Sequence, residues 1–77
     1  MTKGELYDGI AVILEVDRSS IMDNAELSAF EEWNSLSAIS FIAFADEKIG
    51  HVVDPKILKN AKTIKDLYEI VRSKIEQ

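Results

Sequence analysis

The chain has 77 residues, a formal net charge of −5 and no cysteine. A chain of this length holds one domain, residues 1–77, and the lack of cysteine excludes disulfide bonds, thiolate metal sites and a cysteine nucleophile. The acidic balance argues against nucleic acid as a partner, because contacts to phosphates need a basic surface.

The first predicted helix runs from about Lys3 to Val16. Thr2 and Glu5 have the T-x-x-E spacing of a capping box, which satisfies free amides at a helix start. Apolar residues then recur at helical spacing, at Leu6, Ile10, Ile13 and Leu14. We therefore expect one face of this helix to be buried.

A long connection, residues 17–34, follows the first helix. It is rich in Asp, Ser and Asn, which hydrogen-bond to nearby backbone and favour turns. Three spaced apolar side chains should hold it against the core: Ile21, Leu27 and Phe30. A connection this long in so small a domain is often functional.

The second predicted helix runs from Leu36 to about Ile49 and stops at Gly50. At about 100° per residue, an inward arc collects Phe41, Ala45, Ala38, Ile49 and Ile42, flanked by Ile39 and Phe44. The opposite, outward stripe consists of Leu36, Ser40, Ala43 and Glu47. We expect most of this helix to be buried, with only the narrow stripe exposed.

Two shorter helices complete the predicted fold. Asp54 should cap a short third helix that has Pro55 at its first position, and Ile57 and Leu58 should pack it. Thr63 and Asp66 resemble a second capping box, and the fourth helix has one apolar face, made of Ile64, Leu67, Tyr68, Val71 and Ile75. The sequence thus predicts an all-α fold, a small antiparallel four-helix bundle with a short third helix and a long first loop.

The most informative position is Ser35, where the polar connection meets the second helix. Asn34 and Ser35 are both good helix caps, and capping alone is a sufficient role for such a pair. The serine also ends the longest loop and precedes Leu36, an apolar residue on the outward stripe. Because a helix start attracts anions, a hydroxyl here is also well placed to carry a phosphate group.

Chemistry performed by the chain alone is not expected. A serine nucleophile needs a positioned base, and the single histidine, His51, lies about 24 Å further along a helix. No second histidine stands at metal-ligand spacing, so we expect no metal site. Trp33 should anchor the end of the loop or form an aromatic lip beside the serine.

At this point the chain resembles the acyl carrier proteins. The likeness covers length, acidity, helix order, the long first loop and the short third helix. Its most specific element is "WNSLSAISFIAF", which is similar to the family's D-S-L motif opening helix two. "TIKDLYEIV" also resembles the family's usual final helix.

The resemblance implies a non-enzymatic carrier. A separate phosphopantetheinyl transferase would attach 4′-phosphopantetheine from coenzyme A to Ser35, between Asn34 and Leu36. The thiol of this arm would hold acyl intermediates as thioesters, for acyl-transferring or condensing enzymes in fatty-acid, polyketide or related lipid biosynthesis. We expect partner docking at Trp33, Ser40, Ala43 and Glu47.

The cargo would be sheltered between the helices. The small residues Ala38 and Ala45 thin the packing there, although simple close packing of helices explains them equally well. We expect a cytoplasmic monomer without membrane insertion, because no apolar run approaches about 20 residues and residues 1–10 do not resemble a signal peptide. The alternative is a small helical protein-interaction module without a prosthetic group, in which Ser35 only caps the helix.

Two positions depart from the family's pattern. The family's aspartate before the serine, which assists the transferase and its metal ion, is Asn34 here, and this implies slower modification or a dedicated transferase. Ser37 and Ser40 stand where members often carry acids on the exposed stripe of helix two. Docking should therefore depend more on Leu36, Ala43 and apolar contact.

Overall fold

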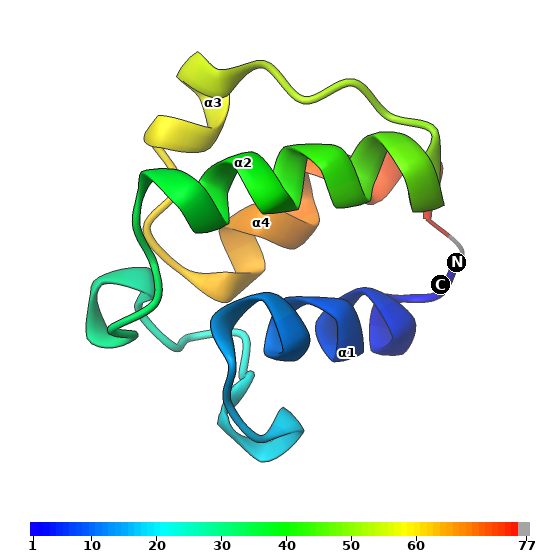
Figure 1. Cartoon of the computed structure of the whole chain (residues 1–77). Coiled ribbons are helices and arrows are strands. Elements are labelled where there is room, and N and C mark those ends of the chain that lie inside the picture. The colour runs from blue at the N-terminus through cyan, green and yellow to red at the C-terminus, as the bar shows by residue number, and fades with distance from the viewer. Residues whose placement is uncertain (76–77) are drawn as a thin grey trace.

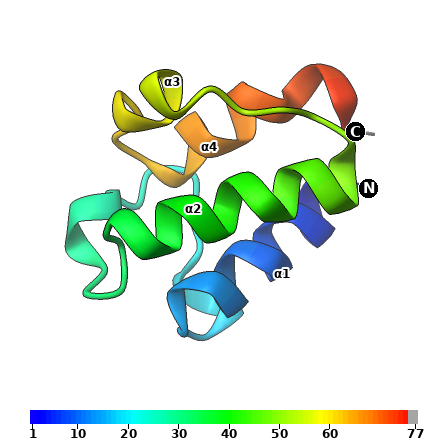
Figure 2. The same cartoon turned by 45° about the horizontal axis from the view of Figure 1, so that its top comes forward.

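The computed structural model describes residues 1–75. Four α-helices, α1 (Lys3–Leu14), α2 (Ser35–Phe44), α3 (Pro55–Lys59) and α4 (Ile64–Val71), surround a common core. α2 contacts both α1 and α3, and α3 contacts α4 (Figures 1 and 2). Within the described residues no strand forms beyond an isolated bridge between Glu26 and Thr63. The predicted all-α class and the order of the four helices are confirmed.

α1 begins as predicted and ends earlier than predicted. The Glu5 amide donates to Thr2 Oγ1 (3.2 Å) and the Thr2 amide donates to Glu5 Oε1 (2.9 Å), which completes the capping box. The helix ends at Leu14 rather than Val16, because Glu15 adopts a left-handed backbone with φ 56° and ψ 45°. A glutamate in this conformation is strained, since its Cβ approaches the following carbonyl oxygen.

Replacing Glu15 with glycine is expected to stabilise the protein by about 0.5–1 kcal/mol, because glycine adopts the left-handed conformation without this clash. The midpoint of thermal unfolding, followed by circular dichroism, should rise by roughly 3–6 °C for a domain of this size. Glu32→Gly is the matched control, since Glu32 is also an exposed loop glutamate but has an ordinary negative φ. The control should lower the midpoint, and equal shifts for the two variants would refute the assignment of strain.

The long connection is held against the core as expected. Ile21 and Leu27 are each only 2% exposed, and Phe30 is half-buried against the same cluster. Two short 3-10 turns, Arg18–Ser20 and Leu27–Ala29, lie within it. Its apolar anchors are therefore confirmed, and its polar residues form turns as their chemistry predicts.

Backbone hydrogen bonds tie this connection to the start of α4. The Leu27 amide donates to the Lys62 carbonyl (2.8 Å). In return, the Ile64 amide donates to the Ala25 carbonyl and the Lys65 amide to the Asp23 carbonyl, each at 3.0 Å. The first amides of a helix have no partner within the helix, so the connection satisfies two groups that α4 leaves open.

Side chains also join the connection to α1. The Tyr7 hydroxyl donates to Asp23 Oδ1 (2.6 Å), and Lys3 Nζ lies 3.3 Å from Asp23 Oδ2. Burial and the Asp23 hydrogen bond raise the pKa of Tyr7 far above its usual value, and the bonds from Tyr7 and Lys3 lower the pKa of the Asp23 carboxyl. A carboxyl whose pKa is lowered by folding stabilises the fold at pH values above its pKa in the unfolded chain, about 3.9. This contribution is lost as the pH falls through the lower pKa of the folded state. The link is therefore intact at neutral pH.

α2 continues as one π-helical turn, Ala45–Ile49, and stops at Gly50. Gly50 has a left-handed φ of 74°, and the amides of Gly50 and His51 both donate to the Ala45 carbonyl. The predicted end of the helix and its glycine stop are thus confirmed. Near this end, the Phe44 ring packs directly on Gly9 of α1, where any Cβ would overlap the ring.

The second helix is more exposed than its sequence suggests. Phe41 and Ala45 are buried as predicted, but Ile39, expected beside the inward arc, is 61% exposed. In α3, Leu58 is buried while Ile57, also expected to pack, is 55% exposed. α3, the element that packs beside this part of α2, is only five residues long, and it leaves Ile39 largely uncovered. The predicted apolar face of the fourth helix is buried at all five positions, but α4 ends at Val71, so Ile75 packs into the core from extended backbone beyond the helix.

Candidate functional site

Ser35 is the first residue of α2 and its side chain is exposed. Within residues 1–75 its hydroxyl takes part in no hydrogen bond. A hydroxyl in this state is accessible to another protein and is not needed to hold the local fold. These are the steric requirements for modification by a separate enzyme.

The cap of α2 is Asn34, assisted by Ser37. Asn34 Oδ1 accepts from the amides of Leu36 (2.9 Å) and Ser37 (3.1 Å). The Ser37 hydroxyl accepts from the Asn34 amide (2.8 Å) and donates to the Asn34 carbonyl (3.0 Å). Of the two residues that could cap the helix, Asn34 is therefore the cap and Ser35 takes no part in it. The prediction that Ser37 lies on the exposed stripe is wrong. Its side chain is only 7% exposed, because its hydroxyl points back to Asn34 and completes the cap.

Replacing Asn34 with alanine is expected to destabilise the protein by about 1 kcal/mol, because two amides of α2 lose their acceptor. Asn34→Asp keeps one oxygen on these amides and adds a negative charge near the positive end of the helix, so it should be neutral or stabilising by about 0.3–1 kcal/mol. Urea unfolding of the two variants measures the difference. Alanine and aspartate variants of equal stability would show that the cap seen here does not support α2.

A cavity of about 390 Å³ opens beside the serine, between α2 and α3. Residues from the loop end and from both helices line it: Trp33, Asn34, Ser35, Ala38, Ile39, Ile42, Pro55, Leu58 and Lys59. Six of these side chains are apolar, so the walls favour an apolar occupant. Ala38 belongs to this wall, as its small size suggested, whereas Ala45 is fully buried elsewhere.

The predicted site residues divide into two groups. Trp33, Asn34 and Ser35 lie together at the cavity. The outward stripe of Leu36, Ser40, Ala43 and Glu47 is exposed as predicted, with Leu36 at 73% exposure, but none of it lines the cavity. Glu47 belongs to the π-helical turn at the far end. The stripe is thus a surface next to the cavity and not part of it.

Sequence reasoning missed the wall that α3 supplies. Pro55, Leu58 and Lys59 are brought to Ser35 by the fold, although they lie 20 to 24 residues further along the chain. Asp54 positions this wall, because its side chain accepts from the Lys56 amide (2.8 Å) and starts α3. Asp54-Pro55 did predict the short helix, but no local signal indicates which surface it covers.

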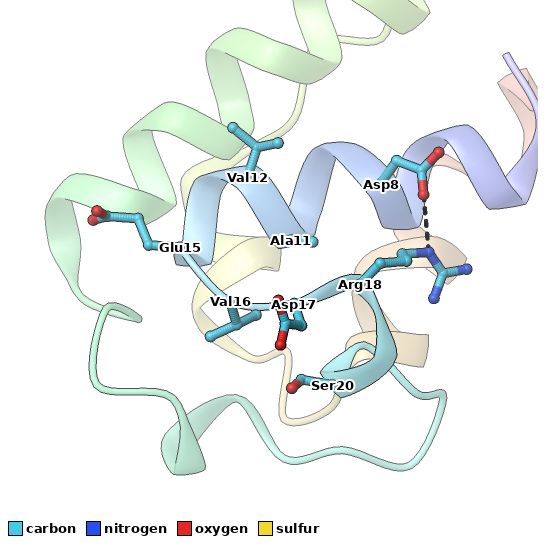
Figure 3. Close-up of a pocket in the computed structure, with 8 residues that line it drawn as sticks. All are labelled: Asp8, Ala11, Val12, Glu15, Val16, Asp17, Arg18 and Ser20. Atoms are coloured by element: carbon cyan, nitrogen blue, oxygen red, sulfur yellow. Dashed lines mark hydrogen bonds and ion pairs between the residues drawn. The ribbon is translucent and has the colours of Figure 1, made fainter.

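A larger hollow lies between the end of α1 and the turn Arg18–Ser20 (Figure 3). Its one cation is already paired, because Arg18 Nε lies 3.0 Å from Asp8 Oδ1 and Arg18 Nη1 donates to the Ile21 carbonyl. Acidic and apolar side chains cover the rest of its open surface, including Val12 and Glu15. Ser20 also lines it, but only three of its eight lining side chains are apolar, so it suits an apolar occupant less well than the cavity beside Ser35 and we do not take it as the site.

Two further features of the described residues bear on other functions. No group of three or more His, Cys, Asp or Glu side chains in residues 1–75 is arranged to hold a metal ion. None of the helices in this part of the chain combines the length and apolar character needed to cross a bilayer.

No family model, curated protein or solved structure matches this chain. The residues around Ser35 and their arrangement are therefore what points to a function.

Proposed function

We propose that this chain is an acyl carrier protein, modified at Ser35 with 4′-phosphopantetheine. The transferase would join the serine oxygen to the β-phosphorus of coenzyme A. The bond between this phosphorus and the oxygen that bridges the two phosphates would break, and adenosine 3′,5′-bisphosphate would leave. The serine proton would pass to a base of the transferase. The arm's thiol then carries acyl groups as thioesters, which supplies the sulfur that this cysteine-free chain lacks.

One observation carries this proposal: an exposed serine hydroxyl, unused by its own helix cap, opens beside an apolar cavity. If Ser35 served only to start the helix, its hydroxyl would be expected in the cap, yet Asn34 and Ser37 perform that role. A modifiable group next to an apolar cavity suits a tether that carries an apolar cargo. The geometry therefore supports the same residue that the D-S-L-like motif indicates.

The cavity would shelter the acyl chain. Its apolar walls face a chain tethered at Ser35, and burial of apolar surface contributes about 25 cal/mol per Å². The outward stripe lies on the same helix and would remain available to partner enzymes while the cavity is occupied. Leu36 is its largest exposed apolar side chain and the natural anchor for such a partner.

A protein-interaction module without a prosthetic group is the second candidate. The observation that favours it is the exposure of Leu36, Ile39 and Ile57, at 73%, 61% and 55% respectively, near the same cavity. Scattered exposed apolar residues are normal, but these three lie on adjacent helices. This candidate needs no modification of Ser35, which is how the two functions are separated.

Intact-mass analysis after incubation with coenzyme A and a permissive phosphopantetheinyl transferase tests the proposal. We expect a gain of one phosphopantetheine per chain. No gain with several transferases, for both the wild type and Asn34→Asp, would refute the carrier function and favour the interaction module.

The choice of Asn34→Asp as the second protein in this test has a structural basis. Asn34 Oδ1 is occupied by two amides of α2, and the other side-chain atom, Nδ2, makes no hydrogen bond within residues 1–75. Aspartate would place a charged oxygen at that second position, where the amide presents only N–H groups. We expect this variant to be modified faster than the wild type, since a transferase metal ion attracts an anionic oxygen.

A further inference from the structure

Among residues 1–75, Lys59 is the one charged side chain that lines the cavity beside Ser35. It is the last residue of α3, and its side chain is exposed at the rim of an otherwise apolar wall. Within residues 1–75 it forms no ion pair and no hydrogen bond from its side chain. Its ammonium group is therefore available to a ligand that enters the cavity.

No acidic side chain of α2 competes for this cation, because Ser35–Phe44 contains no charged residue. The acid nearest to Lys59 in the sequence is Asp54. It caps the first turn of α3, whereas Lys59 ends this helix, and its side chain accepts a hydrogen bond from the Lys56 amide. A wall that is apolar apart from a single uncommitted ammonium group suits a ligand with an apolar body and an anionic group.

We propose that Lys59 forms an ion pair with an anionic oxygen group on the chain tethered at Ser35. This inference rests on the proposed carrier function and names the chemistry of its cargo. The anionic group has two possible sources, a carboxylate on the acyl chain itself or the phosphodiester of the arm. In the first case the cavity selects acyl groups that carry a carboxylate; in the second, Lys59 positions the arm for any cargo.

Four forms of the protein distinguish these sources: unmodified, carrying the arm alone, carrying octanoyl, and carrying the eight-carbon acyl group that ends in a carboxylate. Each form is prepared as wild type, Lys59→Met and Lys56→Met. Methionine keeps the length and apolar stem of lysine, and Lys56 is an exposed lysine of the same helix that does not line the cavity. The unmodified form gives the baseline for any effect of each substitution on the fold.

The readout is the midpoint of thermal unfolding. An ion pair at an exposed rim should raise it by about 2–5 °C relative to Lys59→Met, and the shift should shrink at high salt. A shift confined to the carboxylate-bearing form assigns the partner to the cargo. A shift already present with the arm alone assigns it to the phosphodiester. Lys56→Met should produce neither shift.

Trp33 reports separately on the cavity, because it is the single tryptophan of the chain and lines the wall beside Ser35. Its fluorescence should change when octanoyl is loaded, whether or not Lys59 is present. Equal unfolding midpoints for Lys59→Met and Lys56→Met in every loaded form would overturn the role of Lys59. A failure to load any form would instead refute the carrier function, so the two failures are distinguishable.

Discussion

Ser35→Ala is expected to abolish the phosphopantetheine mass gain completely under conditions in which the wild type is fully modified. The bond to phosphorus forms through the serine oxygen, and alanine has none. The result is expected without unfolding, because the Ser35 hydroxyl takes no part in the cap of α2. An exposed substitution of this kind should change the free energy of unfolding by less than about 0.5 kcal/mol.

Ser73→Ala is the control for this variant. Ser73 is also an exposed serine, but it belongs to the 3-10 turn Arg72–Lys74, away from the outward stripe, and does not line the cavity. It should be modified to the same extent as the wild type, as shown by intact mass and by mapping of the modified peptide. A persistent mass gain in Ser35→Ala, or its loss in Ser73→Ala, would place the attachment elsewhere and remove the basis of the proposed function.

Phe41→Ala is expected to cost about 3–5 kcal/mol of stability, the range for emptying a buried aromatic site. Phe41 is 1% exposed and lies on the inward side of α2 within the core cluster. A domain of this size has roughly 4–12 kcal/mol in total, so the substitution should remove a quarter of the stability or more. Urea unfolding at low temperature, followed by circular dichroism, measures the loss.

Ile39→Ala provides the comparison on the same helix. Ile39 is 61% exposed, so its truncation should cost less than about 1 kcal/mol. The pair therefore tests which side of α2 carries its stability. If Ile39→Ala proved as damaging as Phe41→Ala, the orientation of α2 described above would be wrong.

The helices were predictable because their signals are local. Thr2 with Glu5, Thr63 with Asp66, and Asp54 with Pro55 each mark a helix start through bonds spanning two or three residues. Apolar periodicity then identified the buried faces of α1 and α4. The end of α1 was missed because the left-handed turn occurs at Glu15, a residue type that gives no such signal.

The site was only half predictable, for the opposite reason. Trp33, Asn34 and Ser35 are consecutive, so the loop-to-helix transition revealed them. The other wall depends on how α3 docks on α2, which no local pattern specifies, and Ile39 and Ile57 were wrongly expected to be covered. The part that Ser37 takes in the cap of α2 was also missed, because Ser37 was placed on the exposed stripe, whereas its hydroxyl bonds the Asn34 amide and carbonyl.

The ties between the long connection and α4 have a consequence for divergence among related chains. They are made by the peptide groups of Asp23, Ala25 and Leu27 and not by their side chains. Any residue except proline supplies the same N–H and C=O groups. Apart from Asp23, whose carboxylate bonds Tyr7 and Lys3, the exposed side chains of this segment are thus free to change their charge and shape while its backbone path to Ser35 stays constant.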